Sequence, residues 1–394
     1  MKSVSVMFLT AACCAALISG CTKKELRKDV GAIKEAQVRA EDLKVVKLSD
    51  KLSVNMVRIT PGKFNMSAPD GDNFANETAH NKELKNEFYI GQTEVTQAEY
   101  NEVVRQWKEK FPEKWAELYP EKWNPADADK KFGEDVKPAK PFFCKDGAFK
   151  KLVENIATDN FPVENISWFD AMDFCMMLNE LGYAPEGWKF TLPTETQWEF
   201  AARGGNIEKS RNFKFSGSND VDNVAWHYPN AGGRPKAVGI TDPGAKRSCN
   251  ALGLYDMSGN IAEWCLDSWK DYSQETAAEF SDNYQQMRDR FHELVRVEIE
   301  NLLAKENKRA PRVEMTPELK AELDAFDAWK VYRGGSWNGA YNVCRVSNRS
   351  AVKPYKLVRS LKEEKGKKSI VTYTVSGYPH VGFRLVLVPD AVEK

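Results

Sequence analysis

Cysteine is the residue type with the widest chemical scope in this sequence, and Cys21 has the most specific setting. An apolar stretch, Val4–Ile18, runs up to it, and charged residues begin again just after it, at Lys23. The stretch has the length of a signal-peptide core and is too short to span a membrane. Small residues before a cysteine at this place are typical of lipoprotein signals, in which the thiol receives a diacylglycerol before cleavage. We therefore expect residues 1–20 to be a signal peptide and Cys21 to be the lipid-bearing first residue of the mature chain.

The alternative for Cys21 is an ordinary secretory signal with a chance cysteine at its end. No Asp follows Cys21, so an inner-membrane retention signal of that type is absent and sorting to the outer membrane is expected. Lys+Arg and Asp+Glu both total 57, which gives a net charge of zero and argues against a nucleic-acid partner. The expected partners are the membrane, through the lipid, and other proteins of a bacterial cell envelope.

The other cysteines offer less chemistry. Cys13 and Cys14 leave with the signal peptide. An oxidising compartment permits disulfides, but the odd number that remains leaves at least one thiol unpaired. No two of them have the CxxC spacing, which argues against a zinc knuckle. The mature chain keeps five cysteines beyond the anchor: Cys144, Cys175, Cys249, Cys265 and Cys344.

The rest of the chain must form the body that the anchor holds. Its 11 Trp and 24 Gly favour a loop-rich body with aromatic packing. Residues 21–53 are charged and predict a tether, and an alternation of apolar and polar residues predicts the first strand at 54–59. Residues 101–160 are rich in Lys, Glu, Trp and Pro and are interpreted as a mainly helical insertion. Its Trp residues are expected to pack the insertion itself, with a binding surface as the alternative.

Two helices are predicted between the insertions. Residues 171–181 have an apolar face at helical spacing. Thr194 is a typical N-cap residue, Gln197 stands at the capping-box position, and the helix 195–202 ends before Gly204-Gly205. Both helices are therefore expected to belong to the core of the body.

A second insertion is predicted at 270–330. Residues 281–308 are strongly helical with an apolar stripe, and a second helix is expected over 317–329. We expect these helices to form a hairpin packed on the body, with a coiled-coil partner site as the alternative. A final strand at 381–388 and a tail at 389–394 close the chain.

Five blocks of sequence, each weak evidence alone, occur in one order along the chain. Together they resemble the sulfatase-modifying-factor family, whose founding activity is that of the formylglycine-generating enzyme. The resemblance implies one loop-rich α+β domain over 54–388, related to the C-type lectin fold, with the two mainly helical insertions set into it. The blocks are Met56–Phe64, Thr93–Tyr100, Pro162–Gly205, Gly253–Trp264, and Arg333–Trp337 with Gly382–Arg384.

The resemblance implies a copper chemistry for the last block. Family enzymes oxidise a cysteine of a sulfatase to formylglycine with Cu(I) and oxygen, and two cysteines that follow the Ser of a Gly-Gly-Ser block hold the metal. Ser336 matches that active-site serine, and Cys344 matches the second copper ligand. The first ligand position is Gly339, which has no donor, although Cu(I) prefers two thiolates. Cys344 is thus either a reactive thiol or a plain buried one, and the founding activity is in doubt.

The resemblance also implies a calcium site. Asp256 and Glu263 match its side-chain ligands, and Gly259 and Ile261 match positions that bind through their carbonyls. Oxygen donors suit this hard cation. The alternative is that Asp256 and Glu263 cap turns or pair with Arg residues. A family disulfide is not expected, because Cys175 matches one partner while the other position holds Leu385.

Two functions of different classes follow from these residues. The first is a lipid-anchored, non-catalytic scaffold or binding module of the cell envelope. The second is a copper-dependent formylglycine-generating oxidase acting on sulfatase cysteines, which Ser336 and Cys344 support. Carbohydrate binding through calcium rests only on the fold analogy to lectins.

Overall fold

The computed structural model describes most of the chain from residue 38 onward. Within these residues, no helix is both long enough and apolar enough to cross a membrane. The predicted signal peptide, the predicted lipid site at Cys21 and the first half of the predicted tether, residues 21–37, lie outside the described residues. The described ranges are 38–67, 76–118, 141–145, 147–207, 212–239, 248–272, 284–326, 328–364 and 367–390.

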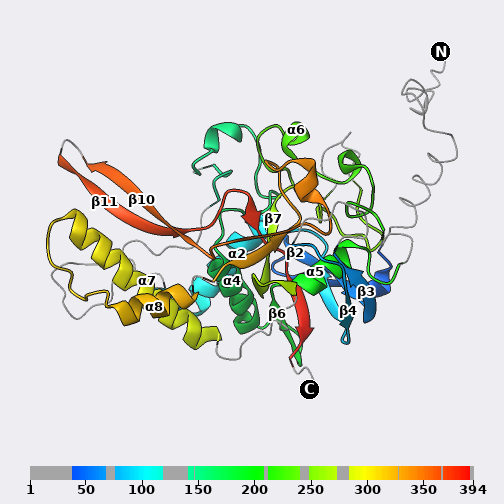
Figure 1. Ribbon diagram of the computed structural model, residues 1–394, viewed down its shortest axis with the longest axis horizontal. Helices are drawn as coiled ribbons and strands as arrows, with labels where there is room; N and C mark the ends of the chain where they lie inside the picture. The colour runs from blue at the N-terminus through cyan, green and yellow to red at the C-terminus, as the bar shows by residue number, and fades with distance from the viewer. Residues whose placement is uncertain are drawn as a thin grey trace, which may run out of the picture.

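The larger sheet is antiparallel throughout, and the last strand of the chain lies inside it. Strand β13 pairs with β5 on one side and with β6 on the other. The sheet therefore joins segments from both ends of the body (Figure 1). Its strands, in spatial order, are β1 (Leu43–Lys47), β2 (Ser53–Ile59), β5 (Phe88–Gly91), β13 (Val386–Pro389) and β6 (Trp188–Thr191).

A second sheet carries the predicted catalytic and calcium blocks. Its order is β12 (Val381–Gly382), β7 (Ala262–Ser268), β8 (Lys330–Arg333) and β9 (Arg349–Val352), and only the β12–β7 pair is parallel. The other strands of the described residues form two separate two-stranded ribbons. They are β3 (Gly62–Met66) with β4 (His80–Leu84), and β10 (Lys356–Glu364) with β11 (Lys367–Ser376).

Three helices of the body begin at side chains that cap them. Thr96 starts α2 (Gln97–Lys110), Ser167 starts α4 (Trp168–Leu181), and Thr194 starts α5 (Glu195–Ala202), each in a full capping box. Such boxes satisfy backbone N–H groups that have no partner within the helix. The predicted helix at 195–202 is confirmed residue for residue, and the one at 171–181 begins three residues earlier than expected.

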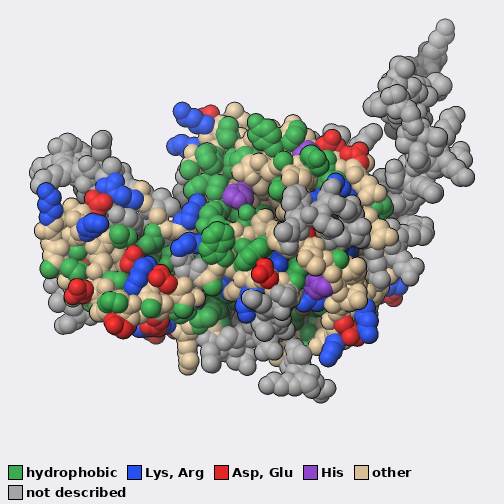
Figure 2. Space-filling model, in the orientation of Figure 1, with side chains coloured by type: hydrophobic (Ala, Val, Ile, Leu, Met, Phe, Trp, Pro, Cys, Tyr) green, Lys and Arg blue, Asp and Glu red, His purple; other side chains and the backbone are tan. Residues whose placement is uncertain are grey.

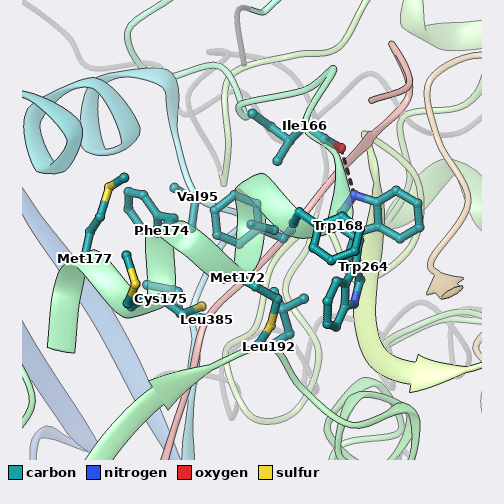
Figure 3. Packing of buried hydrophobic residues seen from close by; sticks show 14 of the residues in the cluster. Val95, Ile166, Trp168, Met172, Phe174, Cys175, Met177, Leu192, Trp264 and Leu385 are labelled. Atoms are coloured by element: carbon teal, nitrogen blue, oxygen red, sulfur yellow. Dashed lines mark hydrogen bonds between the residues drawn. The ribbon is translucent and has the colours of Figure 1, made fainter. Parts of the chain in front are cut away.

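The main core lies around α4, and Figure 3 shows part of it. Trp264 donates its indole N–H to the Ile166 carbonyl at 2.8 Å, so even the large aromatic side chains have their polar atom paired. Cys175 and Leu385 both belong to this core, where the family pattern would place a disulfide. The five cysteines that follow Cys21 all lie within the described residues, and none of them forms a disulfide there.

The second insertion packs on the body, as expected. Its helices are α7 (Tyr284–Glu306) and α8 (Pro317–Phe326), and together with the β10–β11 ribbon they form an arm at one side of the molecule (Figure 1). The Phe291 ring of α7 stacks on Phe169 of α4 with centroids 3.7 Å apart. The arm thus shares the main core rather than standing apart from it.

Two boundaries differ from expectation. Strand β1 lies within the predicted tether, because Val46 and Leu48 are buried and β1 pairs along its whole length with β2. The predicted insertion at 101–160 begins inside α2, continues as α3 (Pro112–Leu118), and returns at 141–161 as a mostly irregular segment with one 3-10 turn, η2 (Lys150–Leu152).

Candidate functional site

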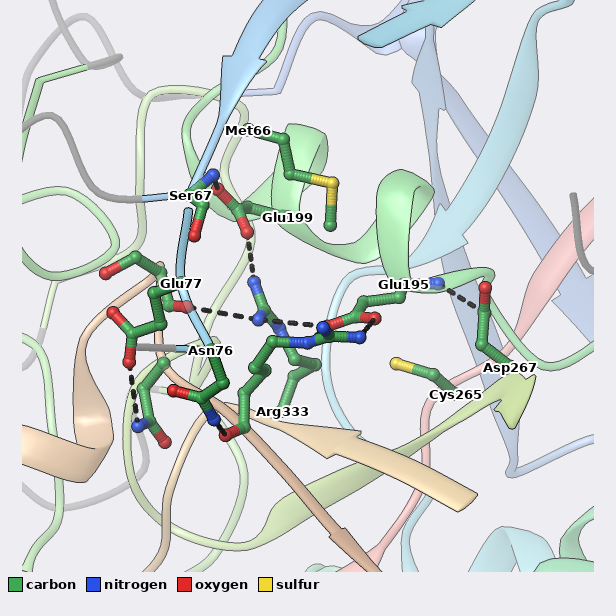
Figure 4. A network of polar contacts seen from close by, with 12 residues as sticks. Met66, Ser67, Asn76, Glu77, Glu195, Glu199, Cys265, Asp267 and Arg333 are labelled. Carbon is green, nitrogen blue, oxygen red and sulfur yellow. Dashed lines mark hydrogen bonds and ion pairs between the residues drawn. The ribbon is translucent and has the colours of Figure 1, made fainter. Parts of the chain in front are cut away.

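Buried ion pairs fix the start of the predicted catalytic loop. Arg333, at the end of β8, donates to Glu195 at 3.2 Å and also contacts Glu199, and both carboxylates come from α5 (Figure 4). All three side chains are completely buried. A buried charge without its partner costs several kcal/mol, so this network strongly favours one position of the backbone that leads into the loop.

The two glycines after Arg333 are required by backbone geometry. Gly334 has φ +95° and Gly335 has φ +69°, a region that other residues rarely adopt. A Cβ on Gly335 would also lie 2.6 Å from the Val343 carbonyl oxygen. The Gly-Gly-Ser block therefore has a structural reason that does not depend on catalysis.

Ser336 and Cys344 are brought together by this loop. The Ser336 backbone is close enough to the Cys344 thiol to lower its pKa. The thiol donates to the Ala340 carbonyl at 3.8 Å, and the Ser336 hydroxyl donates to Asn338 Oδ1 at 2.7 Å. Cys344 ends the short helix η6 (Tyr341–Cys344) and is completely buried beside Val224 and Ala225. Burial raises the pKa of the Cys344 thiol to about 12, against the lowering effect of the Ser336 backbone. At neutral pH the group is a shielded thiol, a poor nucleophile and a poor metal ligand.

Gly339 leaves the implied copper site with one cysteine. The Gly339 carbonyl accepts a hydrogen bond from the Tyr228 N–H at 2.9 Å, at the start of α6 (Tyr228–Ala231). A Cβ on Gly339 would meet the side chain of Val343, so the space of a second thiol is already filled. The residues present do not fit a two-thiolate Cu(I) site.

The calcium-type residues gather around a carboxylate that the sequence reasoning missed, Glu94. Its two oxygens accept from the Asn260 side chain at 3.1 Å and from the Ile261 N–H at 3.2 Å. Burial, and then the charges of Asp256 and Glu263, raise the pKa of Glu94 well above its usual value. Glu94 lies in the block that follows β5. Its place beside the apolar Val95 could have marked it as a buried carboxylate.

Arg384 pairs with the calcium-type residue Glu263. Its guanidinium reaches both Glu263 oxygens, at 2.5 and 2.6 Å, and the Trp198 indole donates to one of them at 2.7 Å. The alternative of an Arg partner therefore holds for Glu263. Asp256, at φ +56°, accepts from the Gly239 N–H at 2.7 Å.

Calcium at this place would have to share Glu263 with the guanidinium. Across the described part of the chain, no three His, Cys, Asp or Glu side chains are grouped as metal ligands. Gly259 is needed for packing, because a Cβ there would lie 2.4 Å from the Trp226 carbonyl oxygen. The carboxylates and Arg384 are suited first of all to joining β7 to the chain after β12.

The end of the first insertion lies against the same loop. Phe143 is completely buried, and its ring meets the Trp337 ring edge-on with centroids 5.2 Å apart. Beneath it lies Glu164, a completely buried carboxylate that the sequence reasoning also missed. Exposed apolar side chains surround this region at Phe149, Leu152, Ile156, Tyr228 and Tyr341, and Figure 2 shows hydrophobic side chains gathered along the upper edge of this face.

Known proteins are similar in sequence to parts of this chain. A chaperone protein, LppX, from Paenibacillus barcinonensis is 34% identical over 146 residues, which cover 27% of this chain and 51% of that protein. A formylglycine-generating enzyme from Thermomonospora curvata is 31% identical over 149 residues, 34% of this chain and 44% of that enzyme. The chain thus spans about half the length of these curated relatives.

A third relative is named as inactive. The inactive C-alpha-formylglycine-generating enzyme 2 of Bos taurus is 25% identical over 257 residues, which cover 58% of this chain and 76% of that protein. The profile of the sulfatase-modifying factor enzyme 1-like domain matches residues 44–361, a range that begins in β1 and ends in β10. The chain therefore belongs to the sulfatase-modifying factor enzyme 1-like domain family.

Proposed function

We propose that this protein is an exported, lipid-anchored and non-catalytic binding module of the cell envelope. The proposal rests mainly on Cys344, the cysteine that matches the second copper ligand of the family. Cys344 is completely buried, its thiol pKa is raised to about 12, and Gly339 stands where its partner ligand would be. The inactive relative from Bos taurus and the chaperone from Paenibacillus barcinonensis support a member of the family without the oxidase reaction.

The anchor in this proposal is a lipid on Cys21, which holds the body at the outer membrane. The arm of α7, α8 and the β10–β11 ribbon is the surface proposed to meet other envelope proteins. Cys21→Ser is expected to move the protein from the membrane pellet to the soluble fraction. Retention of this variant in the pellet would contradict the proposed anchor.

The arm is best tested by surface changes rather than by deletion. Removing α7 would strip Phe291 from Phe169 and open the main core. A double reversal, Glu293→Lys with Asp324→Lys, changes only exposed positions. Pull-down from membranes with the wild type and this variant is expected to show envelope proteins that the variant loses. Identical captured sets would contradict the arm as the docking surface.

Calcium is proposed as a structural ion of the carboxylate group. Asp256 and Glu263 would supply side-chain oxygens, Gly259 and Ile261 would supply carbonyl oxygens, and the cation would offset the negative charge that Glu94 adds. Hard oxygen donors suit this ion. The ion would tie β7 to the neighbouring loops and supplies no reaction step.

The second candidate function is the copper-dependent oxidase. It is favoured by one observation, the closeness of the Ser336 backbone to the Cys344 thiol, which keeps two family positions together. Titration of the purified protein with Cu(I) against a chromophoric chelator separates the two functions. Tight stoichiometric binding that disappears in Cys344→Ser would overturn the binding module, and absence of such binding is expected.

A further inference from the structure

The segment 141–161 forms a small hydrophobic cluster apart from the main core. Phe143, Val153 and Phe161 are its buried members, and Trp337 of the catalytic-type loop packs against them. Arg234 lies over the Phe161 ring at 5.7 Å. The contact of this cluster with Trp337 is therefore not part of the main core.

The backbone of Phe143 is held from both sides by buried side chains. Gln97 Nε2 donates to the Phe143 carbonyl at 3.2 Å, and the Phe143 N–H donates to Glu164 Oε1 at 2.8 Å. Gln97 is 4% exposed and Glu164 is completely buried. Peptide-binding proteins use such main-chain hydrogen bonds for affinity and a side-chain pocket for specificity.

The Phe143 side chain fills such a pocket. Its ring lies edge-on to Trp337, at an interplanar angle of 79°, and 5.0 Å from the Phe149 ring. Edge-to-face contacts of this kind stabilise a buried ring beyond the area it removes from water. The pocket thus selects an aromatic side chain. The hydrogen bonds of Gln97 and Glu164 go to the backbone and do not depend on which side chain is present.

The second carboxyl oxygen of Glu164 makes no hydrogen bond to the described residues. This atom, Oε2, is buried. Buried polar atoms of native proteins are nearly always paired, so an unpaired one marks a place where a further group can bind. It lies on the residue that holds the Phe143 N–H.

We propose that Gln97, Glu164 and Trp337 form a subsite for a short peptide segment with a phenylalanine side chain. In this structure the chain's own Phe143 occupies it. A segment of a partner protein with the same chemistry displaces residues 141–145 and takes their hydrogen bonds. This proposal rests on the proposed function as a binding module and names the class of ligand that the module takes.

The test uses the full chain with Phe143→Ala, which empties the pocket. The probe is a fluorescein-labelled peptide of residues 141–149 with Cys144→Ser, and its matched partner carries Phe143→Ala in addition. Fluorescence anisotropy is expected to show the Phe143→Ala protein binding the phenylalanine peptide at least about tenfold more tightly than the alanine peptide. The wild type, with its pocket filled, is expected to bind both peptides weakly.

Two variants sharpen this result. Leu152→Ala removes an exposed apolar side chain from the same segment and is expected to behave as the wild type. Glu164→Leu in the Phe143→Ala background removes the atom that accepts the backbone N–H at this position, and is expected to weaken binding of the phenylalanine peptide. A Phe143→Ala protein that unfolds cooperatively yet binds both peptides equally would overturn the proposal.

A second measurement decides the matter if Phe143→Ala does not fold. Hydrogen exchange of the wild type in excess phenylalanine peptide is expected to be faster at the Phe143 amide and unchanged at α5. Unchanged exchange at Phe143 would overturn the proposal. Neither outcome affects the Cu(I) titration or the membrane pull-down, so failure of this subsite and failure of the binding module are distinguishable.

Discussion

A Cβ atom placed on Gly339 would lie 2.6 Å from Cγ2 of Val343. The loop has therefore closed over the position where the family's first copper cysteine stands. Loss of the ligand and loss of the space for it go together in this chain. Restoring the thiol requires changing both residues.

Gly339→Cys alone is expected to lower the free energy of unfolding by about 1–3 kcal/mol, because it overpacks the loop. Adding Val343→Ala is expected to recover stability and to create a two-thiolate Cu(I) site. Chelator competition measures the site, and Cys344→Ser in the double variant is the control that should abolish it. Equal Cu(I) affinity of the wild type and the double variant would contradict this prediction.

Glu164 is expected to make stability depend on pH. Burial raises its pKa from 4.5 to about 8, so the folded chain keeps the proton in a window where the unfolded chain has lost it. Since the folded state binds more protons there, the free energy of unfolding falls as pH rises from about 4.5 to 8.

Glu164→Gln stays neutral at both pH values. Between pH 5 and pH 8 its free energy of unfolding, measured with denaturant, is expected to fall less than that of the wild type, by on the order of 3–5 kcal/mol. Glu154→Gln, at an exposed position of the same segment, is the matched control and should follow the wild type. Parallel pH profiles for the wild type and Glu164→Gln would show that the buried carboxylate does not carry this dependence.

Calcium is expected to stabilise the protein through Asp256. Saturating Ca²⁺, at about 100 times its dissociation constant, adds about 2.7 kcal/mol to the free energy of unfolding of any protein that binds it only when folded. The melting temperature of the wild type should therefore be higher with Ca²⁺ than with a chelator. The melting temperature of Asp256→Ala should be the same in both conditions. Asp50→Ala removes an exposed carboxylate and should keep the full shift. A wild-type melting temperature indifferent to Ca²⁺ would exclude the ion.

Phe291→Ala is expected to destabilise the whole body and not only the arm. The ring is completely buried and stacked on Phe169, so its removal should cost about 3–5 kcal/mol. One cooperative transition at a lower temperature is expected in calorimetry. Val313→Ala, at an exposed position between α7 and α8, should leave the melt unchanged. Two separate transitions would mean that the arm folds on its own.

Local signals in the sequence located the helices well. Thr194, Gln197 and the glycines after Ala202 delimit α5, because caps and stops act through neighbouring residues. The apolar stripe of α7 at Phe291, Leu294 and Ile299 was likewise visible from its spacing. Strand β1 was not predicted, because it lies in a mostly charged stretch and is fixed by its pairing with β2, which the local sequence does not indicate.

The site was harder to predict because its key residues meet through the fold. Glu94 and Asp256 are far apart in the sequence but influence each other's charge in the fold. Phe143 and Trp337 are likewise far apart in the sequence, and their rings meet in the fold. The family pattern supplied Ser336, Cys344 and the missing ligand at Gly339. It gave no sign that Arg384 would hold both oxygens of Glu263, or that the first insertion would return to cover Trp337.

The place of β13 between β5 and β6 has a consequence for how the protein is made. The larger sheet closes only when residues 386–389 arrive, so a partly synthesised chain cannot complete its main sheet. Pairing between such distant segments is also slow to form. A nascent chain of this topology therefore lacks an inner strand of its larger sheet until almost the end of its synthesis.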